Sequence, residues 1–216
     1  MRIYKDIPQH LETGEANPEW LSLRAGLFTG SDFNQYLGIL GKGLSDTAQT
    51  GLARKVCESL GYQFDSFKTP LMERGIELES KARDMYYFET CNDVQEVAFV
   101  DWEQSRAGCS PDGVIYDDDG NIEGITEFKC PDIVAYLKAS DGYIKPEYRT
   151  QIQFNMLITG AKWCDYVVFF PGMKLVINRV EPDQEAQQQI VVALTMLNEK
   201  YDELLEKVKH LQKEEV

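Results

Sequence analysis

The chain has 216 residues, a formal net charge of −14, 43% hydrophobic residues and 27% charged residues. These values are typical of a folded globular protein, and the length supports one sizeable core rather than two. Apolar runs such as Tyr166–Phe170 are too short to span a bilayer, and residues 1–15 lack the apolar segment of a secretory signal. We therefore expect one cytoplasmic domain over residues 1–216 that contacts no membrane.

The net charge bears on the choice of partner. Phosphate contacts dominate the affinity of nucleic-acid-binding proteins, so these proteins usually carry a basic surface. A charge of −14 taken alone argues against DNA. Two features weaken this objection. A divalent-metal site is itself a concentration of carboxylates, and residues 181–216 hold nine acidic and four basic residues, so part of the excess lies near the C-terminus.

Cysteine and histidine give little support for a zinc or iron–sulfur centre. The five cysteines include no C-x-x-C pair, and His10 and His210 lie near opposite ends of the chain. An odd number of cysteines in a cytosolic chain also argues against disulfides. We predict that the cysteines are small buried thiols.

Helices are predicted in the first part of the chain. Asn17 is expected to cap a helix that begins at Pro18 and reaches about residue 25. Ser31 is expected to cap the next helix, over 32–38, which leads into a glycine-rich loop. Two longer helices follow over 47–60 and 70–89.

The middle and the end of the chain predict strands between further helices. The turn sequence Asp117–Asn121 separates two strands, and Pro171-Gly172 separates two more. Asp132 is expected to cap a short helix. The expected strands cover 94–100, 112–116, 122–130, 163–170 and 174–180, and the later helices cover 146–160 and 183–212. Because helices flank the strands on both sides in sequence, we expect an α/β fold with a central mixed sheet.

Two segments carry a pattern with chemical meaning. Ser110-Pro111-Asp112-Gly113 is followed, after thirteen residues, by Glu127-Phe128-Lys129. Alternation along a strand puts Glu127 and Lys129 on one face and Phe128 on the other. Ile125 shares the face of Glu127, which predicts that this carboxylate is buried and therefore paired or metal-bound. Asp112 begins the neighbouring strand and can reach the same position.

Two carboxylates and an amine are the groups that phosphodiester hydrolysis needs. Carboxylates hold Mg²⁺, which activates water and stabilises charge on the phosphate. The lysine can orient or help to deprotonate the nucleophile and stabilise developing negative charge. The alternative is a solvated hairpin with an ordinary Glu/Lys pair. The S-P-D-G segment at this distance favours the nuclease.

These segments resemble the PD-(D/E)xK nuclease superfamily and, within it, the phage lambda exonuclease/YqaJ-type viral recombinase family. The resemblance implies a three-layer α/β/α, restriction-endonuclease-like core. It also implies two Mg²⁺ ions, with Mn²⁺ as a substitute. By this match Asp112 bridges the metals, Glu127 and the Phe128 carbonyl complete one metal site, and Lys129 is the catalytic lysine.

The segment M-E-R-G-I-E-L-E-S-K-A-R matches a further family pattern. The pattern has a metal-binding glutamate four residues after the glycine, which makes Glu79 the fourth catalytic residue and leaves Glu77 as the second choice. Helical spacing agrees, because Glu79 lies on one stripe with Gly75 and Ala82. The alternative is a partly exposed glutamate paired with Arg83.

Three further resemblances imply contacts to DNA. W-L-S-L-R-A-G-L-F-T-G-S resembles a segment whose arginine and serine, here Arg24 and Ser31, bind a 5′-terminal phosphate; an arginine fork and a helix N-terminus are suited to phosphate. E-Y-R-T-Q-I-Q-F-N resembles a helix that contributes Tyr148 and Gln151 near the same site. Ser110 is expected to add a hydroxyl. A surface arginine, a simple helix cap and a solvent-facing polar stripe are the alternatives.

The family resemblance implies 5′-to-3′ digestion of double-stranded DNA ends that leaves a 3′ single-stranded tail. It further implies a homotrimer ring, a phage single-strand annealing protein as partner, and a phage or prophage origin in a bacterial cytoplasm. In such a ring, basic residues could line the channel while the outside stays acidic; Arg24, Lys42, Arg54 and Lys55 are candidates. The rival functions are a PD-(D/E)xK endonuclease and a non-catalytic module that binds DNA ends.

Overall fold

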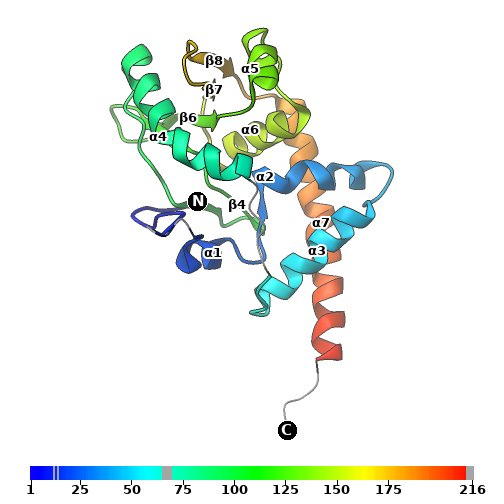
Figure 1. The fold of residues 1–216 in the computed structure, drawn as a ribbon. Coiled ribbons are helices and arrows are strands. Elements are labelled where there is room, and N and C mark those ends of the chain that lie inside the picture. Colours follow the sequence, from blue (N-terminus) through cyan, green and yellow to red (C-terminus); the bar gives the residue numbers. More distant parts are fainter. Residues whose placement is uncertain (12, 14, 65–69, 213–216) are drawn as a thin grey trace.

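A computed structural model gives the fold, and it describes residues 1–216 except 12, 14, 65–69 and 213–216 (Figure 1). The helices are α1 (Pro18–Arg24), α2 (Gly30–Phe33), the 3₁₀ helix η1 (Asn34–Leu40), α3 (Asp46–Ser59), α4 (Pro70–Thr90), α5 (Ile133–Ser140), α6 (Pro146–Thr159) and α7 (Gln184–Leu211). The strands are β1 (Arg2–Tyr4), β2 (Phe28–Thr29), β3 (Phe99–Trp102), β4 (Ala107–Cys109), β5 (Gly113–Tyr116), β6 (Ile122–Lys129), β7 (Trp163–Val168) and β8 (Val176–Val180).

The strands form two mixed sheets of four. The first has the order β1-β3-β4-β2 and the second the order β5-β6-β7-β8. In the second sheet β6 and β7 are parallel, whereas the outer pairs are antiparallel. An isolated antiparallel bridge pairs Val114 of β5 with Gln95, in the segment that leads into β3 of the first sheet. The predicted central mixed sheet is therefore present, in two connected parts.

Helices cover both faces of the second sheet. On one face Ala82 and Tyr86 of α4 pack with Phe128 of β6 in a small buried cluster. On the other face Ile152 and Met156 of α6 join Ile125 of β6 in the main core. The alternation predicted for β6 thus separates two cores, and the α/β/α layering is confirmed.

Helix α6 is the central helix of the main core. Pro146 stands at its first turn, and Gly160 ends it in the left-handed conformation, with φ of 71°, where glycine carries no steric penalty. Most of its residues from Ile152 to Thr159 are buried, since the helix packs against the sheet on one side and against α2 and α7 on others. A helix enclosed in this way is a rigid support for the side chains it carries.

Helix α7 has the predicted amphipathic pattern. Ile190, Leu194 and Leu197 are buried, and the helix packs against η1 and α3 along one side of the molecule (Figure 1). The acidic C-terminal segment, which has no counterpart among the motifs above, thus closes the core. No helix in the described ranges is both long and apolar enough to cross a membrane.

Three parts of the predicted secondary structure are wrong. Ser31 does not cap a helix: Thr29 is the N-cap of α2 and forms a capping box with Asp32, so Ser31 lies within the first turn. The strand expected over 94–100 begins only at Phe99; before it, Gln95 makes an isolated bridge and the Ala98 N–H donates to the Tyr4 carbonyl. The short strands β1, β2 and β4 were not predicted, since two or three residues carry too little pattern.

Candidate active site

Strand β6 brings Glu127 and Lys129 together. Glu127 is 1% exposed although it is a carboxylate, and the ammonium of Lys129 donates a hydrogen bond to Glu127 Oε1. Phe128, between them, packs into the opposite core with Tyr86, with ring centroids 5.9 Å apart at 86°. The backbone alternation predicted from the sequence therefore delivers both charged groups to one point.

Helix α6 supplies further partners for Glu127. Gln151 Nε2 donates to Glu127 Oε1 at 2.7 Å, and Asn155 Nδ2 lies 3.5 Å from Oε2. Tyr148, one turn before Gln151, has its ring centroid 5.1 Å from Lys129 Nζ. The polar stripe Tyr148, Gln151 and Asn155 thus faces the carboxylate, and two amides hold its orientation.

Asp112 reaches the same position from the residue before β5. Its Oδ2 accepts a hydrogen bond from the backbone N–H of Phe128 at 2.7 Å, which fastens the S-P-D-G segment to β6. Gly113 pairs with Thr126 across the two strands. A Cβ at Gly113 would lie 2.0 Å from Val94 Cγ1 and 2.6 Å from Thr126 Oγ1, so only glycine fits after Asp112.

Helix α4 brings Glu79 to the site. Arg83, one turn later, pairs with Glu79 at 3.0 Å and donates to the backbone carbonyl of Asp112 at 3.2 Å. Glu79 and Asp112 therefore share one partner, whereas the side chain of Glu77 is exposed. The geometry favours Glu79 over Glu77 as the fourth carboxylate of the site. The Glu79–Arg83 ion pair, which was the alternative interpretation of Glu79, is also present.

The carboxylates influence one another electrostatically. Burial, and then the charge of Asp112, raises the pKa of Glu79 and of Glu127 to about 7, while Lys129 acts in the opposite direction on both. Burial also raises the pKa of Asp112, against the effect of Lys129 and the Phe128 N–H. Burial lowers the pKa of Lys129, but Glu127 and Asp112 outweigh it and the net shift is upward. The lysine is thus an ammonium among carboxylates that resist full ionisation.

The donor set suits a hard divalent cation. Among the residues that the structure describes, no group of three or more His, Cys, Asp or Glu side chains is arranged to enclose a metal ion. Mg²⁺ does not require such a cage, because it keeps several waters and binds through one or two carboxylates together with substrate phosphates. Neighbouring carboxylates that raise one another's pKa repel one another when they are ionised, and a bound cation relieves this repulsion. Glu79, Asp112 and Glu127, with the Phe128 carbonyl, fit that requirement.

A second cluster, Arg24, Thr29 and Ser31, gathers the residues matched to 5′-phosphate binding. Arg24 Nη2 lies 3.3 Å from Thr29 Oγ1, which lies 3.3 Å from Ser31 Oγ. The Arg24 guanidinium also stacks on the ring of Trp20, with Cζ 4.3 Å from its centroid. We call this group the Arg24 cluster. Thr29 Oγ1 donates to Asp32 Oδ1 at 3.3 Å, so Arg24 and the Ser31 hydroxyl are the groups of the cluster that can donate to an anion.

Ser110 lies beside the Arg24 cluster rather than at the carboxylates. Its hydroxyl donates to the Ala98 carbonyl at 2.8 Å, and that carbonyl also accepts the Trp20 indole N–H at 2.9 Å. Ser110 and the ring under Arg24 therefore share one acceptor.

Helix α6 connects the Arg24 cluster with the carboxylates. Gly30, between Thr29 and Ser31, lies so close to α6 that a Cβ would be 2.4 Å from Asn155 Oδ1 and 3.2 Å from the Gln151 carbonyl. Asn155 and Gln151 are the two amides that contact Glu127. The two groups of residues thus adjoin across a single helix.

Some residues of the site were missed in the sequence, and one candidate is corrected. Thr29 was not singled out, although T-x-x-D is a capping signal, and Arg83 was considered only as a partner that would make Glu79 structural. Lys55, expected to line a DNA channel, is buried; its Nζ donates to the Leu27 carbonyl at 2.7 Å and pairs with Asp32 at 3.0 Å. Lys42 and Arg54 are exposed.

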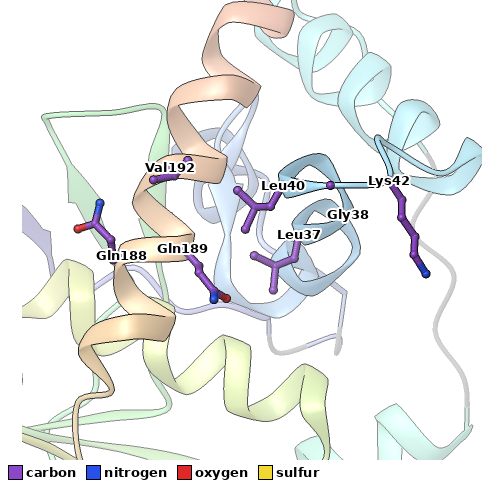
Figure 2. Close-up of a pocket in the computed structure, with 8 residues that line it drawn as sticks. Leu37, Gly38, Leu40, Lys42, Gln188, Gln189 and Val192 are labelled. Carbon is purple, nitrogen blue, oxygen red and sulfur yellow. The ribbon is translucent and has the colours of Figure 1, made fainter.

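A separate hollow of about 600 Å³ lies between η1 and α7 (Figure 2). Leu37 and Leu40 line it together with Val192, and Lys42 is the one ionisable residue of its lining. Figure 2 shows the Lys42 side chain directed away from α7. The hollow has no carboxylate in its lining, so Glu79, Asp112 and Glu127 remain the better candidate for a metal-dependent site.

The layered core and the carboxylate–lysine site on β6 define a restriction-endonuclease-like protein of the PD-(D/E)xK class. The sequence profile of the YqaJ-like viral recombinase domain matches residues 19–162, and the chain belongs to this family. No curated protein sequence matches the chain.

Solved structures give the same relationship. An alkaline exonuclease from Laribacter hongkongensis is 29% identical with a TM-score of 0.73, and the match covers 91% of this chain and 100% of that one. The same enzyme in complex with dAMP is 30% identical with a TM-score of 0.73 and the same coverage. A phage-related exonuclease from Haemophilus somnus, 16% identical with a TM-score of 0.64 over 84% of this chain and 96% of that one, shares the fold.

Proposed function

We propose that the chain is a Mg²⁺-dependent exonuclease that degrades linear duplex DNA from 5′ ends and leaves a 3′ single-stranded tail. The observation that carries the proposal is the environment of Glu127. This buried carboxylate contacts Lys129 and Gln151 and adjoins Asp112 and Glu79. The similarity to the alkaline exonuclease from Laribacter hongkongensis, at 29% identity, supports the same reaction.

The residues divide the work of phosphodiester hydrolysis. Glu79, Asp112, Glu127 and the Phe128 carbonyl would hold the divalent cation, which supplies an activated water and neutralises charge on the phosphate. Mn²⁺ is expected to substitute. Lys129, whose pKa is raised, remains protonated and stabilises the charge that develops on the phosphate oxygens. Gln151 and Asn155 keep Glu127 from rotating.

The Arg24 cluster gives the proposed reaction its direction. A 5′-terminal phosphate held by Arg24 and Ser31 puts the next phosphate of the same strand near Glu127, because the cluster adjoins the carboxylates across α6. Tyr148 and Gln151 would contact the same strand, and Ser110 would support the cluster through Ala98. An endonuclease has no use for such a terminal pocket.

The proposal extends to assembly and partners. A homotrimer ring threaded by DNA would reconcile a net charge of −14 with phosphate binding, since exposed Lys42 and Arg54 could face the channel. A single-strand annealing protein would then receive the 3′ tail in recombination of the phage type.

The test uses duplexes labelled at the 5′ or 3′ end of one strand, with 5′-phosphoryl or 5′-hydroxyl termini. We expect the 5′ label to be released first and 5′-phosphorylated ends to be degraded faster. Arg24→Ala should reduce the rate on phosphorylated ends roughly 10- to 150-fold, the effect of losing a charged hydrogen bond. Arg2→Ala, at an exposed arginine of β1, is the control and should change nothing. Release of the 3′ label first would overturn the proposed direction.

A further inference from the structure

Arg83 lies among the residues expected to hold the cation. Its Nη2 donates to Glu79 Oε1 at 3.0 Å and to the Asp112 carbonyl at 3.2 Å. The guanidinium also lies against the Phe128 ring, with Cζ 5.9 Å from the ring centroid. Arg83 therefore contacts three of the four residues of the expected metal site. These three residues belong to α4, to the segment before β5 and to β6.

The fourth residue, Glu127, has its own support. Gln151 and Asn155 of α6 contact its two carboxylate oxygens. The Asp112 carboxylate is held by the Phe128 N–H at 2.7 Å, so what Arg83 adds is the link between Asp112 and Glu79. The support of the site is thus divided between the amides of α6 and the arginine of α4.

The link depends on one nitrogen. Because Nη2 makes both hydrogen bonds, Glu79 Oε1 and the Asp112 carbonyl cannot move apart without breaking one of them. Nε of the same guanidinium is shielded from solvent and has no hydrogen-bond partner among the residues that the structure describes. A buried donor without an acceptor is destabilising. The guanidinium is therefore placed by its acceptors at the metal site rather than by the satisfaction of all its own donors.

The surroundings of Arg83 argue against a contact with DNA phosphate. Arg83 lines a hollow of about 520 Å³. The lining also includes His10 and four acidic residues, which are Asp6, Glu79, Glu96 and Asp112. Glu96 forms an ion pair with Arg83 Nη1. A hollow with this lining attracts cations rather than phosphate, so the charge of Arg83 serves the carboxylates beside it.

We propose that Arg83 is a positioning residue of the metal site, which holds Glu79 Oε1 and the Asp112 carbonyl at a fixed separation. The carboxylates of α4 and of the S-P-D-G segment are then arranged for the cation before it binds. The inference rests on the proposed function, because it assumes that the cation binds between these carboxylates.

The first measurement is the Kd for Mn²⁺ in the absence of DNA, from the electron paramagnetic resonance signal of free Mn²⁺. Loss of a partner that orients a metal ligand weakens metal binding roughly 10- to 100-fold, and we expect a change of this size in Arg83→Gln. The charge of Arg83 by itself repels a cation, so tighter binding by Arg83→Gln would overturn the proposal, as would an unchanged Kd. Arg83→Lys keeps the charge on a shorter side chain without the arginine fork, and we expect it to bind Mn²⁺ as weakly as Arg83→Gln. Wild-type affinity in Arg83→Lys would show that charge alone is sufficient and would contradict a positioning role.

Two variants control this measurement. Lys81→Gln removes an exposed lysine of α4, two residues before Arg83, and should leave the Kd for Mn²⁺ unchanged. Glu96→Gln removes the partner of Arg83 whose side chain is 71% exposed, and should also leave the Kd unchanged. If Glu96→Gln weakens Mn²⁺ binding as much as Arg83→Gln does, then Arg83 ties α4 to the segment before β3, and the proposal is wrong.

A double-variant cycle tests whether Arg83 acts through Glu79. In Glu79→Gln the carboxylate that Arg83 positions is absent, so Arg83→Gln should weaken Mn²⁺ binding no further in that background. Effects of the two substitutions that simply multiply would overturn the proposal. In saturating Mg²⁺, Arg83→Gln should lower kcat and leave the KM for DNA unchanged, because Arg83 contacts carboxylates and not phosphate.

The outcomes separate this inference from the proposed function. Duplex binding in EDTA, measured by fluorescence anisotropy, should be the same for Arg83→Gln and wild type, which also shows that the variant folds. Weaker DNA binding by a variant with the wild-type Tm would identify Arg83 as a DNA contact and overturn the proposal. Degradation of linear DNA by wild type, with an unchanged Kd for Mn²⁺ in Arg83→Gln, would refute the role of Arg83 alone. Weaker Mn²⁺ binding in Arg83→Gln, without degradation by wild type, would uphold that role and refute the nuclease.

Discussion

Asp165 ties the helix that carries Glu79 to the central sheet. This carboxylate of β7 is 1% exposed and accepts hydrogen bonds from Arg179 Nε and Nη2, both at 2.8 Å, and from the Tyr86 hydroxyl at 2.7 Å. Tyr86 follows Glu79 by about two turns of α4. The perturbation we consider is Asp165→Ala.

The expected loss of stability in Asp165→Ala depends on what happens to each hydrogen-bond partner of Asp165. The Tyr86 hydroxyl would be left buried without its acceptor, which costs about 1–3 kcal/mol. Removing one partner of a fully buried ion pair costs about 3–5 kcal/mol, but the Arg179 side chain is 51% exposed and water can replace the carboxylate there. We therefore expect the free energy of unfolding to fall by about 2–3 kcal/mol.

Urea denaturation of wild type, Asp165→Ala, Tyr86→Phe and the double variant measures this cost. The double variant should be more stable than the sum of the single effects predicts, by about 1 kcal/mol, because both single variants break the same bond. Asp118→Ala, in the exposed turn after β5, should stay within about 0.5 kcal/mol of wild type. Strict additivity, or a loss below about 0.5 kcal/mol in Asp165→Ala, would refute the reasoning.

Three further predictions concern pH, metal and packing. Burial and the bond to Asp165 raise the pKa of Tyr86, so the contribution of Tyr86 to the free energy of unfolding is complete below pH of about 10 and is lost as the pH rises toward the folded pKa. Tyr86→Phe should therefore make the alkaline loss of stability shallower by about 1.4 kcal/mol per pH unit. Equal slopes for the two proteins in urea titrations would contradict this. Mg²⁺ at a hundred times its Kd should stabilise wild type by about 2.7 kcal/mol, a rise in Tm of roughly 5–10 °C, and an equal rise in Asp112→Asn would speak against a metal site there. Gly124→Ala should cost about 1–3 kcal/mol because the new Cβ would lie 2.4 Å from the Trp163 ring, whereas Gly41→Ala, with no atom within 4 Å, should be neutral in the same measurement.

Local pattern predicted the centre of the site well. Alternation along β6 was enough to bring Glu127 and Lys129 to one face. The family pattern chose Glu79 over Glu77, and helical spacing agreed with that choice. The placement of these side chains could be predicted because each depends on residues that are close in sequence and belong to one strand or helix.

Pairing between distant segments could not be predicted in this way. Strand β2 has two residues, and it forms only because β4, almost eighty residues later, lies beside it. Tyr86 and Asp165 are 79 positions apart, so no local pattern connects them. Lys55 had the appearance of a surface lysine on α3, but its partners are Asp32 and the Leu27 carbonyl in other elements.

The capping of α2 shows a local signal that was misassigned. Both Thr29 and Ser31 can cap a helix, and the capping box with Asp32 decides for Thr29. That shift of two residues frees the Ser31 hydroxyl to join Thr29 and Arg24 in one cluster.

The central claim is a metal-dependent nuclease that starts at DNA ends, and one reaction tests it most directly. Linear duplex and covalently closed circular DNA are incubated together with the protein in Mg²⁺, beside Lys129→Ala and an EDTA control. We expect loss of the linear DNA alone, and no loss with the variant or in EDTA. Cutting of the closed circle, or equal degradation by Lys129→Ala, would contradict it.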